Sequence, residues 1–91
     1  MTLNLITNNE NAGWRNWNGG RGTFSVTGAF GGAAVTLQYL GPDGATALDV
    51  GSEVTLGSPG LANFELGAGR IRADVTGGTP GGLYARVSQI P

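Results

Sequence analysis

The sequence predicts an all-β protein, a small single-domain β-sandwich or barrel of about seven short antiparallel strands. From Gly22 to Ile90, apolar and polar residues alternate in short runs, which is the pattern of strands with one buried face. Glycine-containing turns separate these runs at intervals of about ten residues, as in sandwiches and barrels. The 18 glycines also disfavour helices, because each glycine costs a helix about 1 kcal/mol relative to alanine.

The first 20 residues are expected to form an extended N-terminal arm, and residues 21–91 the β-sandwich domain. Asparagine recurs throughout the arm, and its side chain favours turns and hydrogen bonds to the backbone over a regular strand ladder. Only residues 3–7 are apolar enough for a short strand. The asparagines of this segment are Asn4, Asn8, Asn9, Asn11, Asn16 and Asn18.

The strands of the domain are expected at residues 23–30, 35–39, 45–50, 53–56, 62–66, 70–75 and 83–90. The turn Gly41-Pro42-Asp43-Gly44 has proline at its second position, which is typical of type I and type II turns. We therefore expect the strands on either side of this turn to pair as a hairpin.

A second hairpin is expected around the turn at residues 67–69. Its two strands alternate clearly, with apolar side chains on one face and charged side chains on the other. The expected core positions are Phe64, Leu66, Ile71, Ala73 and Val75, whereas Arg70, Arg72 and Asp74 face solvent.

The chain contains no histidine, cysteine or lysine, so the common general bases, soft metal ligands and activators of nucleophiles are missing. We predict that the protein is not an enzyme and has no catalytic residues, cofactor or metal. The acidic residues are better explained as solvated strand and turn residues than as a glycosidase pair, which needs a cleft. The glycine-rich runs at residues 19–22 and 77–82 precede no expected helix, and we interpret them as turns rather than phosphate-binding loops.

The charge pattern limits the classes of partner. The net charge is −1 and the five arginines are scattered, so nucleic acid is not an expected partner. No segment approaches the roughly 18 apolar residues of a membrane span, so no membrane partner is expected. The N-terminus lacks the profile of a signal peptide, which predicts synthesis in the cytoplasm.

The low charge also bears on self-association. Charged residues are 12% of the chain, whereas an ordinary soluble domain has about 25%. Such a surface is weakly protected against association, which fits a protein that contacts copies of itself or a larger body, although a genome biased toward glycine and alanine codons explains it equally well. Because a small core without disulfide or metal gains stability from oligomerisation, we expect a homo-oligomer.

The segment from Gly13 to Asn18 contains two tryptophans three residues apart, interleaved with arginine and asparagine. These tryptophans could stack on a sugar ring, anchor an interface with another subunit or partner, or fold back as a cap on the sandwich. We favour the interface, because tryptophan and arginine are enriched at binding hot spots. The candidate interface residues are Trp14, Arg15, Trp17 and Arg21.

The asparagine-rich segment is followed by Trp17-Asn18-Gly19-Gly20-Arg21-Gly22, Thr23-Phe24-Ser25-Val26, the run from Val35 to Gly44, Phe64-Glu65-Leu66 and Ile71-Arg72-Ala73. Over most of its length, this order of segments resembles small virion-associated proteins of tailed bacteriophages, especially head decoration or cement proteins. The resemblance implies a β-rich module, often trimeric, that sits on capsomers and locks them after expansion.

From this resemblance we expect a structural virion protein on the capsid surface, synthesised in the host cytoplasm. Its expected partners are the major capsid protein and further copies of itself, in a homotrimer. The alternative is a carbohydrate-binding or structural module of a phage tail or fibre.

Overall fold

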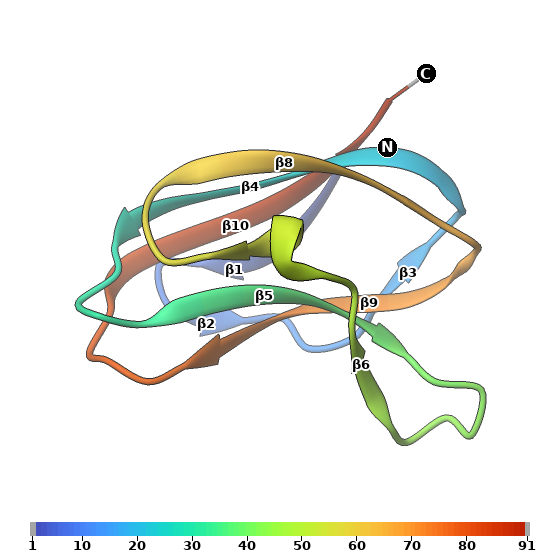
Figure 1. The fold of residues 1–91 in the computed structure, drawn as a ribbon, viewed down its shortest axis with the longest axis horizontal. Helices are drawn as coiled ribbons and strands as arrows, with labels where there is room; N and C mark the ends of the chain where they lie inside the picture. Colours follow the sequence, from blue (N-terminus) through green and yellow to red (C-terminus); the bar gives the residue numbers. More distant parts are fainter. Residues whose placement is uncertain (1, 91) are drawn as a thin grey trace.

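Two antiparallel sheets face each other in the computed structural model, which describes residues 2–90 (Figure 1). The prediction of an all-β sandwich is confirmed. The elements are β1 (Thr2–Thr7), β2 (Glu10–Asn11), β3 (Arg15–Trp17), β4 (Gly20–Ala29), β5 (Ala34–Leu40), β6 (Ala47–Asp49), the short 3-10 helix η1 (Ser52–Val54), β7 (Thr55–Leu56), β8 (Gly60–Leu66), β9 (Gly69–Thr76) and β10 (Gly81–Gln89).

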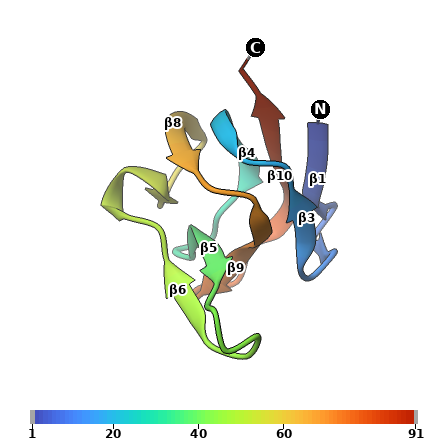
Figure 2. The same cartoon turned by 90° about the vertical axis from the view of Figure 1, so that its right-hand side faces the viewer.

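The strand order defines the two layers. Sheet A has the order β2-β1-β10-β4-β8, and sheet B has the order β3-β9-β5-β6, with β7 pairing to β5 as well. Figure 2 shows the layers end on, with β8 and β6 on one flank of the sandwich and β1 and β3 on the other. No helix among the described residues is long and apolar enough to cross a membrane.

The N-terminal segment does not form the expected extended arm; its described residues belong to both sheets. Strand β1 pairs with β10 inside sheet A, with Leu5 and Ile6 buried, and β3 pairs with β9 in sheet B. Asn8 and Asn9 have φ angles of 48° and 69° and form the two-residue turn between β1 and β2. Asparagine tolerates this left-handed conformation, so here it makes a hairpin turn rather than breaking the ladder.

Asn9 fastens this turn to the other end of the chain. Its side-chain amide donates to the carbonyl of Pro80 at 3.1 Å, and its side-chain oxygen accepts from the N–H of Leu83 at 2.7 Å. The glycine run at 77–82 thus connects β9 to β10. It also packs closely on a neighbouring loop, since a Cβ on Gly78 would lie 2.2 Å from the nitrogen of Ala33.

The hairpin around Gly41-Pro42-Asp43-Gly44 is confirmed. Strand β5 pairs with β6 in antiparallel register, and the N–H of Gly44 donates to the carbonyl of Gly41 at 3.0 Å. The return strand β6 covers only Ala47–Asp49, so it is shorter than the strand expected at residues 45–50.

For the second expected hairpin, the predicted pairing of the two strands is wrong, but the predicted buried face is right. Strand β8 pairs with β4 in sheet A, whereas β9 pairs with β3 and β5 in sheet B, so the chain crosses between sheets after Leu66. Both strands turn their apolar residues to the same interior, and alternation looks alike for a hairpin and for such a crossing. Phe64, Ile71 and Ala73 are buried, and Leu66 and Val75 pack partly buried against them.

Trp17 fills one end of the core between the two sheets. Its side chain is 2% exposed, its ring centroid lies 5.2 Å from that of Phe64, and its indole N–H donates to the carbonyl of Leu66 at 3.3 Å. Gly22 provides the space, because a Cβ there would lie 2.7 Å from the Phe64 ring and 2.9 Å from the Trp17 ring. Of the three interpretations given above for the tryptophans, which were sugar stacking, an interface and an intramolecular role, the intramolecular one therefore applies to Trp17.

Replacing the two tryptophans by alanine separately tests this difference in burial. Trp17→Ala should lower the free energy of unfolding by about 3–5 kcal/mol, because it empties a large core site. Trp14 is half-buried, so Trp14→Ala should cost only about 0.5–1 kcal/mol. Urea unfolding followed by far-UV circular dichroism measures both values, and similar small losses would contradict the assigned position of Trp17.

Asp43 gives the fold a pH dependence at low pH. The hydroxyl of Thr46 and the backbone N–H groups of Thr46 and Ala45 donate to its carboxylate, which lowers the pKa of Asp43 from 3.8 to about 2. The folded state therefore prefers the ionised form, and this stabilisation is present above pH 3.8 and is lost as the pH falls through about 2.

A carboxyl ¹³C NMR titration checks this assignment. The midpoint for Asp43 should lie near pH 2, and Thr46→Val should move it back toward 3.8, because the largest cause of the shift is removed. A wild-type midpoint near 3.8 would show that the turn does not hold the carboxylate in this way.

Candidate functional site

The four candidate interface residues do not form one surface. Trp17 is buried, so its side chain is not available to a partner. Arg15 lies exposed on β3 and donates to the carbonyl of Asn4 at 3.3 Å, whereas Trp14 packs on the outer face of sheet B. Arg21 is exposed on the outer face of sheet A, where it faces Glu65 on β8. The segment therefore contributes to several parts of the sandwich rather than to a single contact site.

A row of interacting side chains holds Trp14 against the outer face of sheet B. The guanidinium carbon of Arg72 lies 4.5 Å from the centre of the Trp14 ring, and its Nε donates to Oε1 of Gln38 at 2.8 Å. The amide of Gln38 donates in turn to Asp49 at 2.9 Å. Gln38 is only 8% exposed, so the row is a structural network whose polar atoms bind one another. Sequence reasoning missed it, because the register between β9, β5 and β6 aligns these positions.

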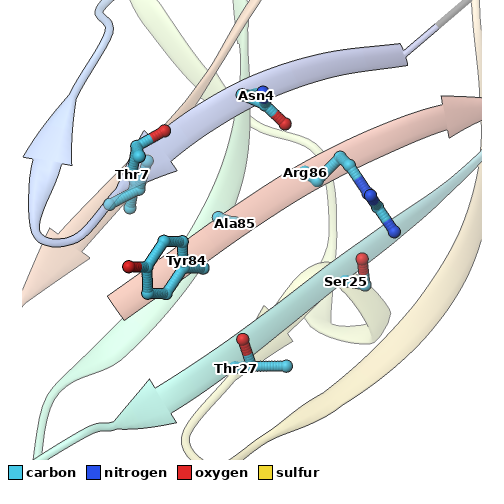
Figure 3. Close-up of a pocket in the computed structure, with 8 residues that line it drawn as sticks. Asn4, Thr7, Ser25, Thr27, Tyr84, Ala85 and Arg86 are labelled. Atoms are coloured by element: carbon cyan, nitrogen blue, oxygen red, sulfur yellow. The ribbon is translucent and has the colours of Figure 1, made fainter. Parts of the chain in front are cut away.

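A hollow of about 420 Å³ lies on the outer face of sheet A, over its three inner strands. Figure 3 shows β10 running through its centre, between β1 on one side and β4 on the other. The hollow is lined by Asn4, Ile6, Thr7, Ser25, Thr27, Tyr84, Ala85 and Arg86.

Register and side-chain length explain this shape. Arg86 faces both Asn4 and Ser25 across the ladders, so one long side chain stands between two short ones. The β1 register shifts between Asn4 and Ile6, and the two residues after Asn4 are both buried. This irregularity removes an outward side chain from β1 and leaves the face open beside β10.

The lining of the hollow combines one aromatic ring, one cation and several short polar groups. Tyr84 is 50% exposed. Arg86 is exposed and forms no hydrogen bond or ion pair with any residue from 2 to 90. None of the lining side chains is a carboxylate. The sequence predicted that alternate residues of this strand face outward, but it did not indicate which side chains flank them.

A second surface, which we call the open flank, consists of β6, η1 and β8. Strand β8 forms one edge of sheet A and β6 one edge of sheet B, and η1 lies beside β8 (Figure 2). Leu61 on β8 is 67% exposed and Leu48 on β6 is 47% exposed. Within residues 2–90 no strand pairs with the outer edge of β8, and η1 is the element that contacts β8 on this flank.

No group of three or more acidic residues in the described part of the chain could hold a metal ion. Every buried side-chain polar atom from residue 2 to 90 has a hydrogen-bond partner. Comparison of the chain with protein-family models, curated proteins and solved structures finds no match.

The two neighbouring arginines of β9 test the network on sheet B. Arg72→Ala should lower the free energy of unfolding by about 1–3 kcal/mol, because it leaves the buried oxygen of Gln38 without its donor. Arg70 is exposed on the same strand, and Arg70→Ala should change stability by less than about 0.5 kcal/mol. Guanidinium unfolding measures both, and equal effects would mean that the Arg72 contacts contribute nothing.

Proposed function

We propose that this chain is a structural protein of a tailed-bacteriophage virion, a decoration or cement protein that binds the outside of the head and stabilises contacts between capsomers. The observation that carries the proposal is the open flank, where β8 and β6 each form the edge of a sheet and the η1 segment lies between them. Unpaired edge strands are templates for pairing with another chain, and proteins that remain alone protect them.

The open flank has little of the usual protection. Edge strands are commonly blocked by lysine, proline or inward charges. Within β8 the only charged residue is Glu65, and the chain has no lysine. The strands of this flank also carry the exposed Leu61, which faces Ser25 on the outer face of sheet A, and the exposed Leu48, which faces Tyr39. These features favour a contact with another protein over permanent exposure to water.

The proposed self-association is a homotrimer. Around a three-fold axis, the sheet A edge of one copy would face the sheet B edge of the next, and such a head-to-tail contact closes into a ring when each copy is rotated by a third of a turn. The trimer compensates for the small core of a 91-residue domain. The major capsid protein is the second partner, and the capsid surface is the proposed location.

The alternative is a carbohydrate-binding or structural module of the phage tail or a fibre, and the observation that favours it is the hollow with the exposed ring of Tyr84. The number of copies per purified virion separates the two. A decoration protein is present in hundreds of copies, whereas a tail component is present in a handful.

Charges placed on the open flank test the assembly. The double variant Leu48→Asp, Leu61→Asp should sediment as a 9.2 kDa monomer and lose binding to undecorated heads, because it places two charges in the contact. Asn16→Asp adds one negative charge on β3, at the opposite flank, and should leave both properties unchanged.

Sedimentation and unfolding of the wild-type protein test the proposed oligomer directly. A monodisperse 9.2 kDa species at tens of micromolar, with an unfolding midpoint independent of protein concentration, would exclude the proposed oligomer.

A further inference from the structure

We propose that the hollow on the outer face of sheet A is a binding site for an acidic saccharide, a sugar ring that carries a carboxylate. The site lies over the inner strands β1, β10 and β4, whereas the open flank lies at the sheet edges. The two surfaces adjoin where Leu61 on β8 faces Ser25 on β4. The volume of the hollow, about 420 Å³, falls within the range of roughly 300–1,000 Å³ that small-ligand pockets occupy.

Arg86 is the group that selects an anion. It is the only charged side chain that lines the hollow, and its guanidinium has no carboxylate partner among the described residues. A free guanidinium presents donors in a planar fork that matches the two oxygens of a carboxylate. Figure 3 shows its side chain extending from β10 toward Ser25 on β4, so the ligand's acid group would lie over that strand.

Tyr84 supplies the surface for the sugar ring. Its side chain is 50% exposed and lies between Thr7 and Thr27 in Figure 3, two residues from Arg86 on the same strand and the same face. An aromatic ring with a polar tip offers both an apolar face and a hydrogen-bonding group. The apolar C–H face of a pyranose fits such a ring, while its carboxylate reaches the arginine.

The remaining lining groups suit sugar hydroxyls. Thr7, Ser25 and Thr27 provide hydroxyls, and Asn4 provides an amide, so each can donate and accept. None of them has a hydrogen-bond partner through its side chain among residues 2–90, which leaves their polar atoms free for a ligand.

Two other classes of ligand fit less well. An extended peptide would need free backbone groups, but β10 and β4 are paired on both sides, and β1 is paired with β10 and, at Ile6 and Thr7, with β2. Nucleic acid would need several cations along its backbone, whereas the hollow contains one. Glu10 faces Thr7 across the β1–β2 ladder and would repel an anion at that end. The acid group of the ligand therefore points to Arg86.

An NMR titration of the full chain with methyl glucuronide, methyl glucoside and acetate tests the site. The uronide should give saturable amide shifts confined to the lining residues, the neutral glucoside weaker shifts at the same residues, and acetate shifts near Arg86 alone. Arg86→Gln should remove the preference for the uronide over the glucoside. Tyr84→Ala should abolish the shifts with both sugars, because the ring platform is lost.

Arg70→Gln is the matched control, since it removes one exposed arginine from the other sheet and should leave the titration unchanged. The amide spectrum of each variant reports its fold, and Arg86→Gln alone decides the question if Tyr84→Ala does not fold. The proposal is overturned if the uronide gives no saturable shifts at the hollow, if Arg86→Gln keeps the preference, or if Arg70→Gln removes it. Equal responses to acetate and to the uronide would also overturn it, because the sugar would then contribute nothing.

Discussion

The contact between Trp17 and Phe64 is the interaction on which the arrangement of the chain depends most. Strand β3 has only three residues, yet it ends in an indole that is almost completely buried and that binds the carbonyl of Leu66. Burying such a large aromatic side chain offsets the weak pairing of so short a strand. Immediately after Trp17 the chain crosses from sheet B to sheet A, and Gly22 leaves the room that both rings need.

The fold class and most buried faces could be predicted from the sequence, because alternation reports which side chains face the interior. Strand pairing could not. Phe64 and Ile71 both point inward, but they belong to different sheets, and two short strands around a glycine turn look alike in either arrangement. The prediction of an extended N-terminal arm was wrong for another reason. The density of asparagine in this segment suggested an irregular chain, but Asn8 and Asn9 adopt positive φ angles and form a tight hairpin turn.

The tryptophan pair shows which signal was present but unused. Trp14 and Trp17 are three residues apart, and an odd spacing in an extended segment places two side chains on opposite faces. The spacing therefore indicates that the two tryptophans differ in burial, and in the structure Trp17 is buried whereas Trp14 is only half-buried. The hollow carried no comparable signal, because Asn4, Ser25 and Arg86 become neighbours only through the order β1-β10-β4.

The two proposed surfaces make different demands on sheet A and are compatible. Assembly would use β8 at its edge, and ligand binding would use the three strands inside it. The two surfaces adjoin at Leu61, which faces Ser25 of the hollow across the β4–β8 ladder. An open hollow with a single cation would bind one sugar weakly, but many copies on the proposed particle would engage a repeating glycan together, and multivalent attachment exceeds the single-site affinity by roughly 10²–10⁴. Weak binding by each copy would therefore be sufficient for the proposed decorated particle to adhere to a glycan surface.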